Sequence, residues 1–389
     1  MLFKSTIFGC MTNSPRLLQV QQLDNLDSNL LDKVVDFYKR DFPSHLVKTI
    51  DSNFFTCKIG HANPNGSGYF TVATFDDQVI GTCTATRKTL FVLDRLIDVV
   101  EIGDTFTSPN FRKDCMFKEL FHGTISEDDY LNKSVFGRLV AETLLRARNE
   151  GVKYVYGTPN LASKLPYLKR MGFQLVDDGF TMRISCPSRD HPSFKSLGLF
   201  YKVAIFYIKI SRILSLLRTR HYRLEFISER HLISFPQNWH LDGPKGVVSI
   251  SNHAEWIEAR YIKNTDKKYE IIKVVSKRNG SICGYLFFMK QTRTDGFKIL
   301  IMSKALFASR RMLRIKMQLS RIAADSFFEY QNMSLWVDTR ECSSSTRILY
   351  GYLSRKEKVD IVSKVLSDQF SWLKALNFYN FDYGDSDLG

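Results

Sequence analysis

The spacing of apolar residues changes several times along the chain, and each spacing predicts a different element. Between residues 16 and 42 a short apolar run leads into apolar positions at helical spacing, which stop before Pro43. Residues 69–90 read as two strands rich in Val, Ile and Thr, and a third strand is expected from Ile97 to Thr107. This first part of the chain therefore predicts a strand, a helix and a sheet built on a hairpin.

A helix is expected next, over residues 135–150, because its apolar side chains fall on one stripe. A strand at 152–157, a helix at 161–171 and a strand at 173–185 follow. These elements complete an α/β unit. The composition then changes at residues 187–192, which are rich in Pro, Ser and Asp and form the best candidate for a domain boundary.

The second half repeats this order. Asn279 and Gly280 stand between two apolar arms, which is a strong hairpin signal. A helix precedes the hairpin, and a strand, a long helix at 304–330 and a further strand follow it. The same order describes residues 16–157, so we expect an internal duplication of architecture.

Charge is unevenly divided between the halves. Residues 1–190 hold 23 Lys and Arg against 22 Asp and Glu, whereas residues 191–389 hold 32 against 18, so the second half carries +14 of the formal +15. This asymmetry indicates an anionic partner for the second half, such as a sugar nucleotide, a phosphorylated lipid head group, RNA or a membrane surface. Solubility alone is the alternative.

Residues 194–220 combine a wide apolar stripe with regularly spaced cations. Lys195, Lys202 and Lys209 recur every seven residues, and arginines follow. One interpretation is a helix that lies on an anionic membrane. The favoured interpretation is a connector helix packed between two domains with its lysines in water, because wide apolar stripes usually face a core.

The composition, 44% apolar and 24% charged, is that of a globular protein. The sequence has no run of about 18 uncharged apolar residues and its N-terminus makes a poor signal peptide, so we expect a cytoplasmic location, with a peripheral contact at the inner membrane as the alternative. The cysteines are odd in number and scattered, without clustered histidines, which indicates reduced thiols and no metal site. They are Cys10, Cys57, Cys83, Cys115, Cys186, Cys283 and Cys342.

Three stretches resemble the GNAT superfamily of acyl-coenzyme A-dependent N-acyltransferases. They are Gly103–Asp114 (GDTFTSPNFRKD), Ser134–Asn160 (SVFGRLVAETLLRARNEGVKYVYGTPN) and Pro166–Phe173 (PYLKRMGF). The sequence is most similar to a tandem, two-lobed type found with bacterial surface-polysaccharide genes, in which GTPN follows the fifth strand. The resemblance covers about 170 residues, to Ser185.

The resemblance implies an α/β fold with two GNAT-like lobes. Each lobe is expected to be a mixed, mostly antiparallel sheet flanked by helices, and a helical linker joins them. The expected domains are an N-terminal acyltransferase domain at 1–186, a helical linker at 187–245 and a degenerate GNAT-like domain at 246–389. In this family the fourth and fifth strands diverge, and the pantetheine of acyl-CoA lies between them.

The loop that binds the pyrophosphate has two candidate positions, Phe111–Phe117 and Tyr130–Phe136, and both depart from the glycine-rich pattern of the family. We favour the second loop, because phosphate-binding amides must lie at the helix N-terminus itself. Asn132 and Ser134 replace the glycines there, and residues 113–131 become an insertion. The resemblance assigns coenzyme binding to Thr105, Phe106, Thr107, Arg112, Asn132, Lys133, Ser134, Val135, Phe136 and Asn160.

Acyl transfer to an amine needs a base for the amine and an acid for the departing thiolate. Glu101 and Asp104 are the carboxylates on the fourth strand. Since they are three residues apart, we expect them to face opposite sides, with Glu101 as the first choice for the base. Tyr167 is the candidate acid, with a purely packing role as its alternative.

The second half lacks a glycine-containing loop before its long helix, so we expect it to shape the acceptor site and not to bind a second coenzyme. Glu258 and Arg260 in WIEARY and the acidic Asp385 and Asp387 resemble recurring segments of the family and are candidates for substrate binding. The basic residues of the long helix are candidates for binding a diphosphate. They are Arg310, Arg311, Arg314, Lys316 and Arg321.

We therefore predict an N-acyltransferase that moves an acyl group, in the first instance acetyl, from acetyl-CoA or another acyl-CoA to an amine. The amine is expected on a nucleotide- or lipid-linked sugar of a surface polysaccharide. One alternative is an aminoacyl-tRNA-dependent transferase, although nucleic acid is the less favoured partner. The other is a non-catalytic binding protein with a decayed coenzyme site. No metal is expected, and the motifs of α/β-hydrolases, P-loop NTPases, zinc proteases and dinucleotide-binding folds are absent from the sequence.

Overall fold

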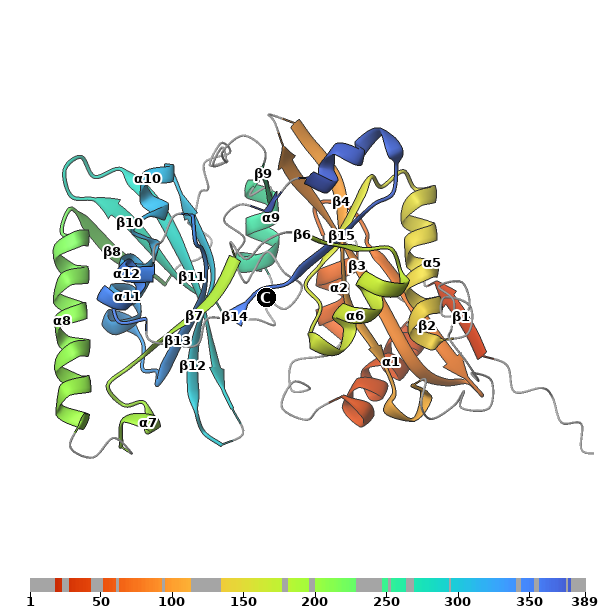
Figure 1. The fold of residues 1–389 in the computed structure, drawn as a ribbon, viewed down its shortest axis with the longest axis horizontal. Coiled ribbons are helices and arrows are strands. Elements are labelled where there is room, and N and C mark those ends of the chain that lie inside the picture. The colour runs from red at the N-terminus through yellow and green to blue at the C-terminus, as the bar shows by residue number, and fades with distance from the viewer. Residues whose placement is uncertain are drawn as a thin grey trace, which may run out of the picture.

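The structure is a computed structural model, and it shows two lobes, each built on one β-sheet (Figure 1). The residues that it describes are 18–22, 28–42, 52–60, 63–92, 95–112, 134–176, 181–195, 200–228, 247–250, 253–263, 269–293, 295–340, 344–352, 357–375 and 377–378.

The first sheet has the strand order β1-β2-β3-β4-β5-β15-β6, and β9 and β16 extend it from β3. Neighbours along this order are antiparallel except β4 and β5, which are parallel. The strands are β1 (Leu18–Gln22), β2 (Tyr69–Phe75), β3 (Gln78–Val92), β4 (Arg95–Thr107), β5 (Tyr154–Gly157), β6 (Gln174–Val176), β9 (Val247–Ile250), β15 (Ile361–Val365) and β16 (Asn377–Phe378).

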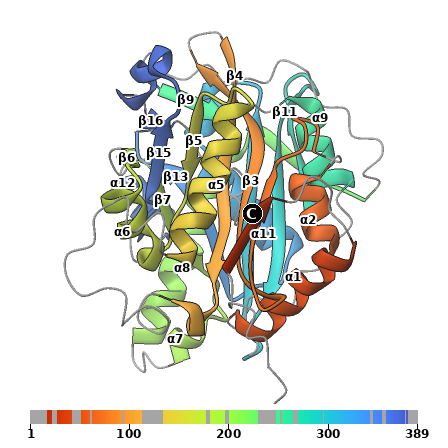
Figure 2. The ribbon, with the colours of Figure 1, turned by 90° about the vertical axis from the view of Figure 1, so that its right-hand side faces the viewer.

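Helices cover both faces of this sheet. On one face, α1 (Ser28–Asp41) and α2 (Ser52–Ile59) bury their apolar sides against β2 and β3. On the other face lie α5 (Val135–Asn149) and α6 (Leu161–Arg170), and Figure 2 shows α5 running across the sheet. The apolar stripes read from the sequence are the surfaces that these helices bury.

The second sheet has the order β14-β7-β13-β12-β11-β10-β8. Its strands are β7 (Thr181–Pro187), β8 (Tyr222–Ile227), β10 (Tyr269–Ser276), β11 (Ile282–Thr292), β12 (Lys298–Phe307), β13 (Asn332–Asp338) and β14 (Glu357–Lys358). The other helical segments are η2 (Pro109–Phe111), α7 (Pro192–Lys195), α8 (Tyr201–Thr219), α9 (Ala254–Ile257), the π-helical η5 (Glu258–Lys263), α10 (Arg310–Leu313), α11 (Lys316–Phe327), α12 (Ser344–Leu349) and η6 (Asp368–Ala375).

The two sheets have the same topology. The series β1-β2-β3-β4-β5 corresponds to β8-β10-β11-β12-β13, and in each series only the last pair is parallel. In each sheet, the strand that follows this series comes from the other half of the chain. β15 lies between β5 and β6, and β7 lies between β13 and β14. The lobes therefore exchange one strand each.

The lobes meet in a buried layer. Trp336 of the second sheet packs in one cluster with Tyr154, Tyr156 and other apolar side chains of the first sheet. The ammonium of Lys88 on β3 lies 5.8 Å from the ring centre of Trp256 on α9. The face of the first sheet that looks toward the second lobe is thus covered by protein at this level.

Several sequence predictions are confirmed. The fold is α/β with two mostly antiparallel sheets flanked by helices. Asn279 and Gly280 form the turn of the antiparallel β10–β11 hairpin, and Gly280 has φ 70°, a conformation that favours glycine. The architecture is duplicated, as the order of elements predicts.

Other features differ from the predictions. The helix expected at 304–330 begins later, because β12 continues to Phe307 and two helices, α10 and α11, follow it. Helix α8 does not connect the two domains: it lies on the outer side of the second lobe and packs on α11 (Figure 1). Sheet membership also crosses the boundaries expected at 186 and 245, because of the strand exchange and because β8 belongs to the second sheet.

Candidate active site

The divergence of two parallel strands opens the first sheet at its centre. β4 and β5 pair only from Val99–Tyr154 to Glu101–Tyr156, although β4 continues to Thr107. Gly157 ends β5, and a Cβ there would lie 2.9 Å from Ile102. Beyond Glu101, β4 still pairs with β3 but no longer pairs with β5, which leaves a gap within the sheet.

A cavity of about 560 Å³ lies at this gap, between the end of β4, the N-terminus of α5 and helix α6. It gathers every described residue that the sequence assigned to coenzyme binding. These are Thr105, Phe106, Thr107, Arg112, Ser134, Val135, Phe136 and Asn160. Asn132 and Lys133 lie outside the described residues, as does most of the first candidate loop. The role of all ten in binding remains a prediction.

The N-terminus of α5 forms one wall of the cavity. Ser134 caps the helix, with its Oγ accepting a hydrogen bond of 2.8 Å from the N–H of Gly137. The N–H groups of the first turn have no intrahelical acceptor and point out of the helix end, and the first turn of α5 has no acidic side chain. Val135 and Phe136 therefore present backbone donors where an anion is favoured.

Basic side chains complete this wall. Arg112 is exposed, donates a hydrogen bond of 3.2 Å to the carbonyl of Thr107, and lies over the ring of Phe106. Lys169 and Arg170 in the last turn of α6 also line the cavity. Neither residue belongs to the family motif that marks the coenzyme site, although both lie just before the Gly-Phe pair, which was the available signal.

Asn160 has a structural role. Its Oδ1 accepts hydrogen bonds from the N–H and the Oγ of Ser163, at 3.0 and 3.1 Å, and so caps α6. The residue still lines the cavity. Asn160 thus stabilises the start of α6, and any contact with coenzyme comes in addition.

Glu101 is completely buried in the layer between the lobes. Its carboxylate forms an ion pair with Lys88, which is also buried, and accepts a hydrogen bond of 3.3 Å from the hydroxyl of Tyr156. A buried carboxylate and ammonium stabilise each other only as a pair, because either charge alone would be strongly destabilised by loss of water. Lys88 was missing from the sequence analysis.

Asp104 lies at a β-bulge and adopts φ 41°. Its carboxylate pairs with Lys58 and accepts a hydrogen bond of 3.1 Å from Thr84, and 19% of its side chain is exposed. Its backbone carbonyl accepts hydrogen bonds from Tyr38 and Thr82. This polar cluster includes residues of α1, α2 and β3 that sequence spacing could not associate with Asp104.

The two carboxylates face the same side of the sheet, contrary to the sequence prediction. Thr84 and Lys88, their partners on β3, are four residues apart in regular register and so point to the same face. The extra residue of the bulge in β4 shifts the alternation and turns Asp104 to the side of Glu101. Both lie on the face opposite α5.

Tyr167 connects α6 with the end of β4. It is 4% exposed, its ring makes edge contacts with Phe136 and Phe173, and its hydroxyl is 3.0 Å from the Oγ1 of Thr105, which lines the cavity. The tyrosine therefore packs in the core and also contacts the cavity wall through Thr105. Thr105 further donates a hydrogen bond of 3.3 Å to Cys83.

Burial raises the pKa of the Cys83 thiol to about 11. The group thus stays protonated at neutral pH, although it lies close to the end of the cavity. A neutral, fully buried thiol is a poor nucleophile.

The candidate acceptor residues are only partly brought together. Arg260 on η5 stacks on Trp256, which also lies over Lys88, so the WIEARY segment borders the Glu101 ion pair. Glu258 is half-exposed and pairs with Lys263 at 3.5 Å. Asp385 and Asp387 lie outside the described residues.

The basic residues of the long helix do not form one solvated face. Lys316 and Arg321 are buried, and Arg321 donates hydrogen bonds to the carbonyls of Tyr350 and Ile208, at 2.7 and 3.2 Å. Arg311 and Arg314 remain near the surface beside α8, where they line a second cavity. Among the described residues, no group of His, Cys, Asp and Glu side chains is arranged to hold a metal ion.

Comparison with known proteins places this geometry in a fold class. The chain has the fold of the GCN5-related N-acetyltransferases: it matches one from Anabaena variabilis with a TM-score of 0.53 and 13% identity, over 90% of this chain and 73% of that one. A probable N-acyltransferase from Enterococcus faecalis (TM-score 0.48, 9% identity, 92% of this chain and 74% of that one) is also similar. So is a tandem GNAT protein from the clavulanic acid biosynthesis pathway (TM-score 0.49, 11% identity, 90% and 99%).

The sequence itself matches no protein-family model, and no curated protein is significantly similar to it. The likeness is therefore one of fold.

Proposed function

We propose that this protein transfers an acyl group from acyl-CoA to an amine, with the coenzyme bound in the first lobe. The observation that carries the proposal is the cavity at the divergence of β4 and β5, which ends at the N-terminus of α5. An acyl-CoA supplies an acyl group already activated as a thioester. The fold alone does not define this chemistry, but the cavity, helix end and flanking cations together fit such a molecule.

The chain offers two kinds of group to the coenzyme. The amides of Val135 and Phe136 at the positive end of α5 suit the pyrophosphate, with Arg112 and Lys169 as charged neighbours. The Cβ of Ser134 replaces the hydrogen of a glycine and keeps the backbone slightly further from a phosphate. The cap that Ser134 provides offsets this, because it fixes the direction of the helix end.

Asp104 is the carboxylate best placed to accept the amine proton. The sequence alone favours Glu101, but Glu101 is completely buried, whereas the side chain of Asp104, which pairs with Lys58, is 19% exposed, and the next residue, Thr105, lines the cavity. In this proposal the amine nitrogen bonds to the acyl carbon, its proton passes to Asp104, and the C–S bond breaks. The departing thiolate takes a proton from Tyr167, relayed through the hydroxyl of Thr105, and Tyr167 regains its proton from water.

The acceptor is proposed to be an amino sugar linked to a nucleotide or a lipid. It would approach Asp104 from the face of the sheet opposite α5, where the side chain of Asp104 is partly exposed. The tandem architecture supports this arrangement, because the second lobe borders that face. The polysaccharide context itself rests on the sequence resemblance.

Calorimetric titration with coenzyme A tests the proposal. The wild-type chain should bind, and Arg112→Ala should weaken binding about tenfold, as expected for loss of one charge-assisted hydrogen bond. Arg148→Ala is the matched control, because Arg148 is an exposed arginine at the opposite end of α5. Absence of binding at about millimolar coenzyme A, far above the affinities of working sites, refutes the proposal.

A transfer assay then tests the acceptor class. Acetyl-CoA and a nucleotide-linked amino sugar serve as probes, and release of the free coenzyme thiol is measured. If the amino sugar is not acylated from acetyl-CoA but salt-sensitive transfer from aminoacyl-tRNA is found instead, the proposal that acyl-CoA is the donor is wrong.

A further inference from the structure

Helix α8 is amphipathic, but its buried side is mostly polar and its exposed side is apolar, which is the reverse of most surface helices. Its buried stripe consists of Ile208, Ser211, Ser215 and Thr219, spaced three or four residues apart. The three hydroxyl groups donate hydrogen bonds of 2.8 to 2.9 Å to carbonyls one turn earlier, so their polarity is satisfied inside the protein. Small polar residues thus face α11, which brings the two helices close together.

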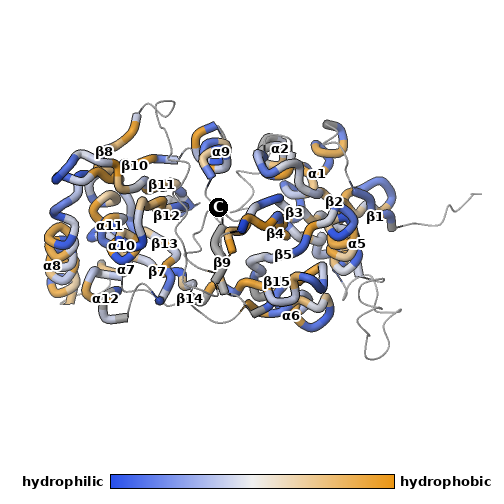
Figure 3. The backbone as a smooth tube through the Cα atoms, turned by 90° about the horizontal axis from the view of Figure 1, so that it is seen from above, coloured by the Kyte–Doolittle hydropathy of each residue, from blue (hydrophilic) through white to orange (hydrophobic). Residues whose placement is uncertain are grey.

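The outward stripe of α8 is apolar. Val203, Phe206, Ile210, Ile213 and Leu217 are again spaced three or four residues apart, and their exposed fractions run from 39% to 64%. Phe200, Tyr201 and Leu216 extend the stripe and are also exposed. A continuous apolar surface of this kind on a folded protein indicates an interaction site. Figure 3 shows α8 at the outer edge of the second lobe, with hydrophobic and hydrophilic positions along it.

Cations flank this stripe, α8 itself carries no acidic residue, and of these cations Arg212 pairs with Asp325 of α11 at 3.5 Å. Lys202, Lys209, Arg212, Arg218 and Arg220 are all exposed, and residues 194–220 contain no Asp or Glu. A second copy of the chain would bring the same cations against each other, which disfavours a dimer through α8. An anionic surface with an apolar interior satisfies both the charges and the stripe.

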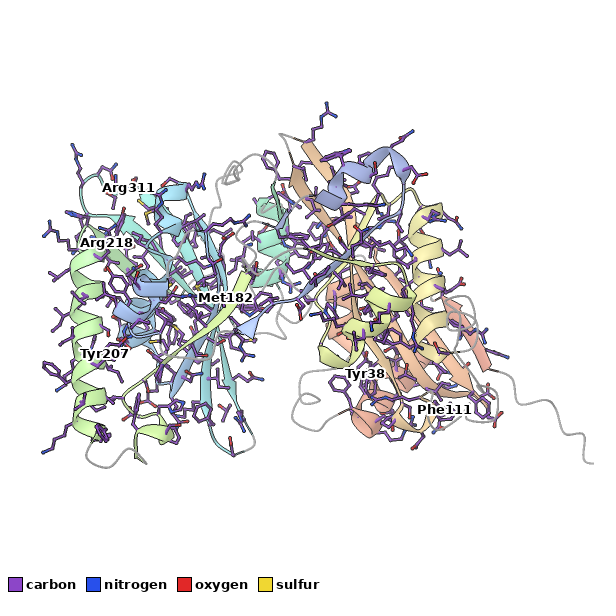
Figure 4. The ribbon with its side chains drawn as sticks, viewed as in Figure 1. Tyr38, Phe111, Met182, Tyr207, Arg218 and Arg311 are labelled. Carbon is purple, nitrogen blue, oxygen red and sulfur yellow. The ribbon has the colours of Figure 1, made fainter. Side chains whose placement is uncertain are left out.

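A basic cavity lies at the C-terminal end of α8. It measures about 460 Å³ and is lined by Arg218, Arg220, His221, Arg311 and Arg314, without an acidic residue. Figure 4 shows Arg218 and Arg311 at the same end of the second lobe. Such a cluster suits the phosphate group of a lipid, because the charged ends of lysine and arginine side chains reach the head groups at a membrane surface.

We infer that α8 is a membrane-docking helix that lies flat on an anionic lipid surface. Its apolar stripe would enter the acyl-chain boundary over about 28 Å, the length of 19 helical residues, and the basic cavity would hold a lipid phosphate. Among the helices that the structure describes, none is long and apolar enough to cross a membrane. The first lobe lies on the opposite side of the molecule from α8 (Figure 1), so docking would leave the acyl-CoA cavity accessible from water.

Sedimentation of the full chain with vesicles tests this inference, independently of coenzyme binding. Vesicles of phosphatidylglycerol and phosphatidylcholine should bind the protein, and vesicles of phosphatidylcholine alone should bind it much less. Binding should weaken with salt. The triple substitution Phe206→Ser, Ile213→Ser and Leu217→Ser should reduce the partition coefficient at least about tenfold, because three apolar side chains no longer enter the lipid.

A matched triple substitution controls for loss of exposed apolar residues elsewhere. Leu96→Ser, Leu145→Ser and Trp372→Ser remove side chains that are 39% to 61% exposed but lie off α8, and binding should be unchanged. Arg218→Ala with Arg311→Ala should reduce binding only to vesicles that contain phosphatidylglycerol.

Three results would overturn the inference. One is wild-type protein that does not bind anionic vesicles. Another is equal binding by the α8 triple variant and the control triple variant. The third is a dimer in sedimentation equilibrium that the α8 triple variant dissociates, because a second copy of the chain would then occupy the stripe.

Discussion

Replacing Glu101 and Asp104 one at a time by their amides separates a carboxylate that stabilises the fold from one that takes part in catalysis. Glu101→Gln leaves the ammonium of Lys88, which is 1% exposed, without its anionic partner. Breaking a buried ion pair costs about 3–5 kcal/mol of unfolding free energy. Asp104 has a side chain that is 19% exposed, so water can replace its interaction with Lys58 in part, and the loss of stability should be smaller.

The effect on turnover should have the opposite order. Removing a general base typically lowers the rate by a factor of about 10² to 10⁴, which is the loss expected for Asp104→Asn. Urea unfolding reports stability, and release of coenzyme thiol from acetyl-CoA, with a nucleotide-linked amino sugar as acceptor, reports turnover. Asp36→Asn, on the exposed surface of α1, is the matched control and should change neither.

A double substitution sharpens the stability measurement. Adding Lys88→Met to Glu101→Gln should cost less than the sum of the single substitutions, because no buried charge is then left unpaired. Full turnover by Asp104→Asn would refute its assignment as the base. Wild-type stability of Glu101→Gln would refute the reasoning about the buried pair.

The remaining predictions concern the strand exchange, the buried thiol and an ion pair. Val362→Asp places a charge at a fully buried position of β15 and should cost more than about 3 kcal/mol of unfolding free energy in urea, whereas Ile348→Asp at an exposed position should cost little. Because burial raises the pKa of Cys83 to about 11, the folded protein should resist alkylation there at about pH 8 and react sooner at partly exposed Cys283, as peptide mass spectrometry can show. Burial alone would raise the pKa of Glu150, but hydrogen bonds from Arg146 and Tyr69 outweigh it and lower this pKa below its ordinary value. The resulting stability is present above the pKa of the unfolded state and is lost as pH falls through the folded pKa, so Glu150→Gln should melt with a weaker dependence on acidic pH than wild type.

The fold follows the local sequence signals where contacts are local. Helix α5, the hairpin turn at Asn279 and the duplicated order of strands each depend on residues close in sequence, so periodicity and turn chemistry predict them. The position of β15 does not follow from such signals. Residues 361–365 read as a strand wherever they pair, and their place beside β5 depends on residues about 200 positions away.

The candidate site divides in the same way. The end of β4 and the start of α5 are marked by a local motif, and the structure gathers these residues around one cavity. The orientation of Asp104 depends on a one-residue bulge, which the alternation rule cannot anticipate because Asp104 adopts a positive φ without being glycine. Lys58 and Lys88 become relevant only through tertiary contacts, so spacing gave no signal for them.

The exchange of β7 and β15 has a consequence for synthesis of the chain. As residues emerge from the ribosome, the first sheet cannot close until Ile361–Val365 have been made, even though β1 to β6 are complete by Val176. Until then, β5 and β6 present unpaired edges. The second sheet incorporates β7 from the segment made earlier. We therefore expect one late closing step that completes both lobes together, and a nascent chain that depends on protection of its open strand edges for about half of its synthesis.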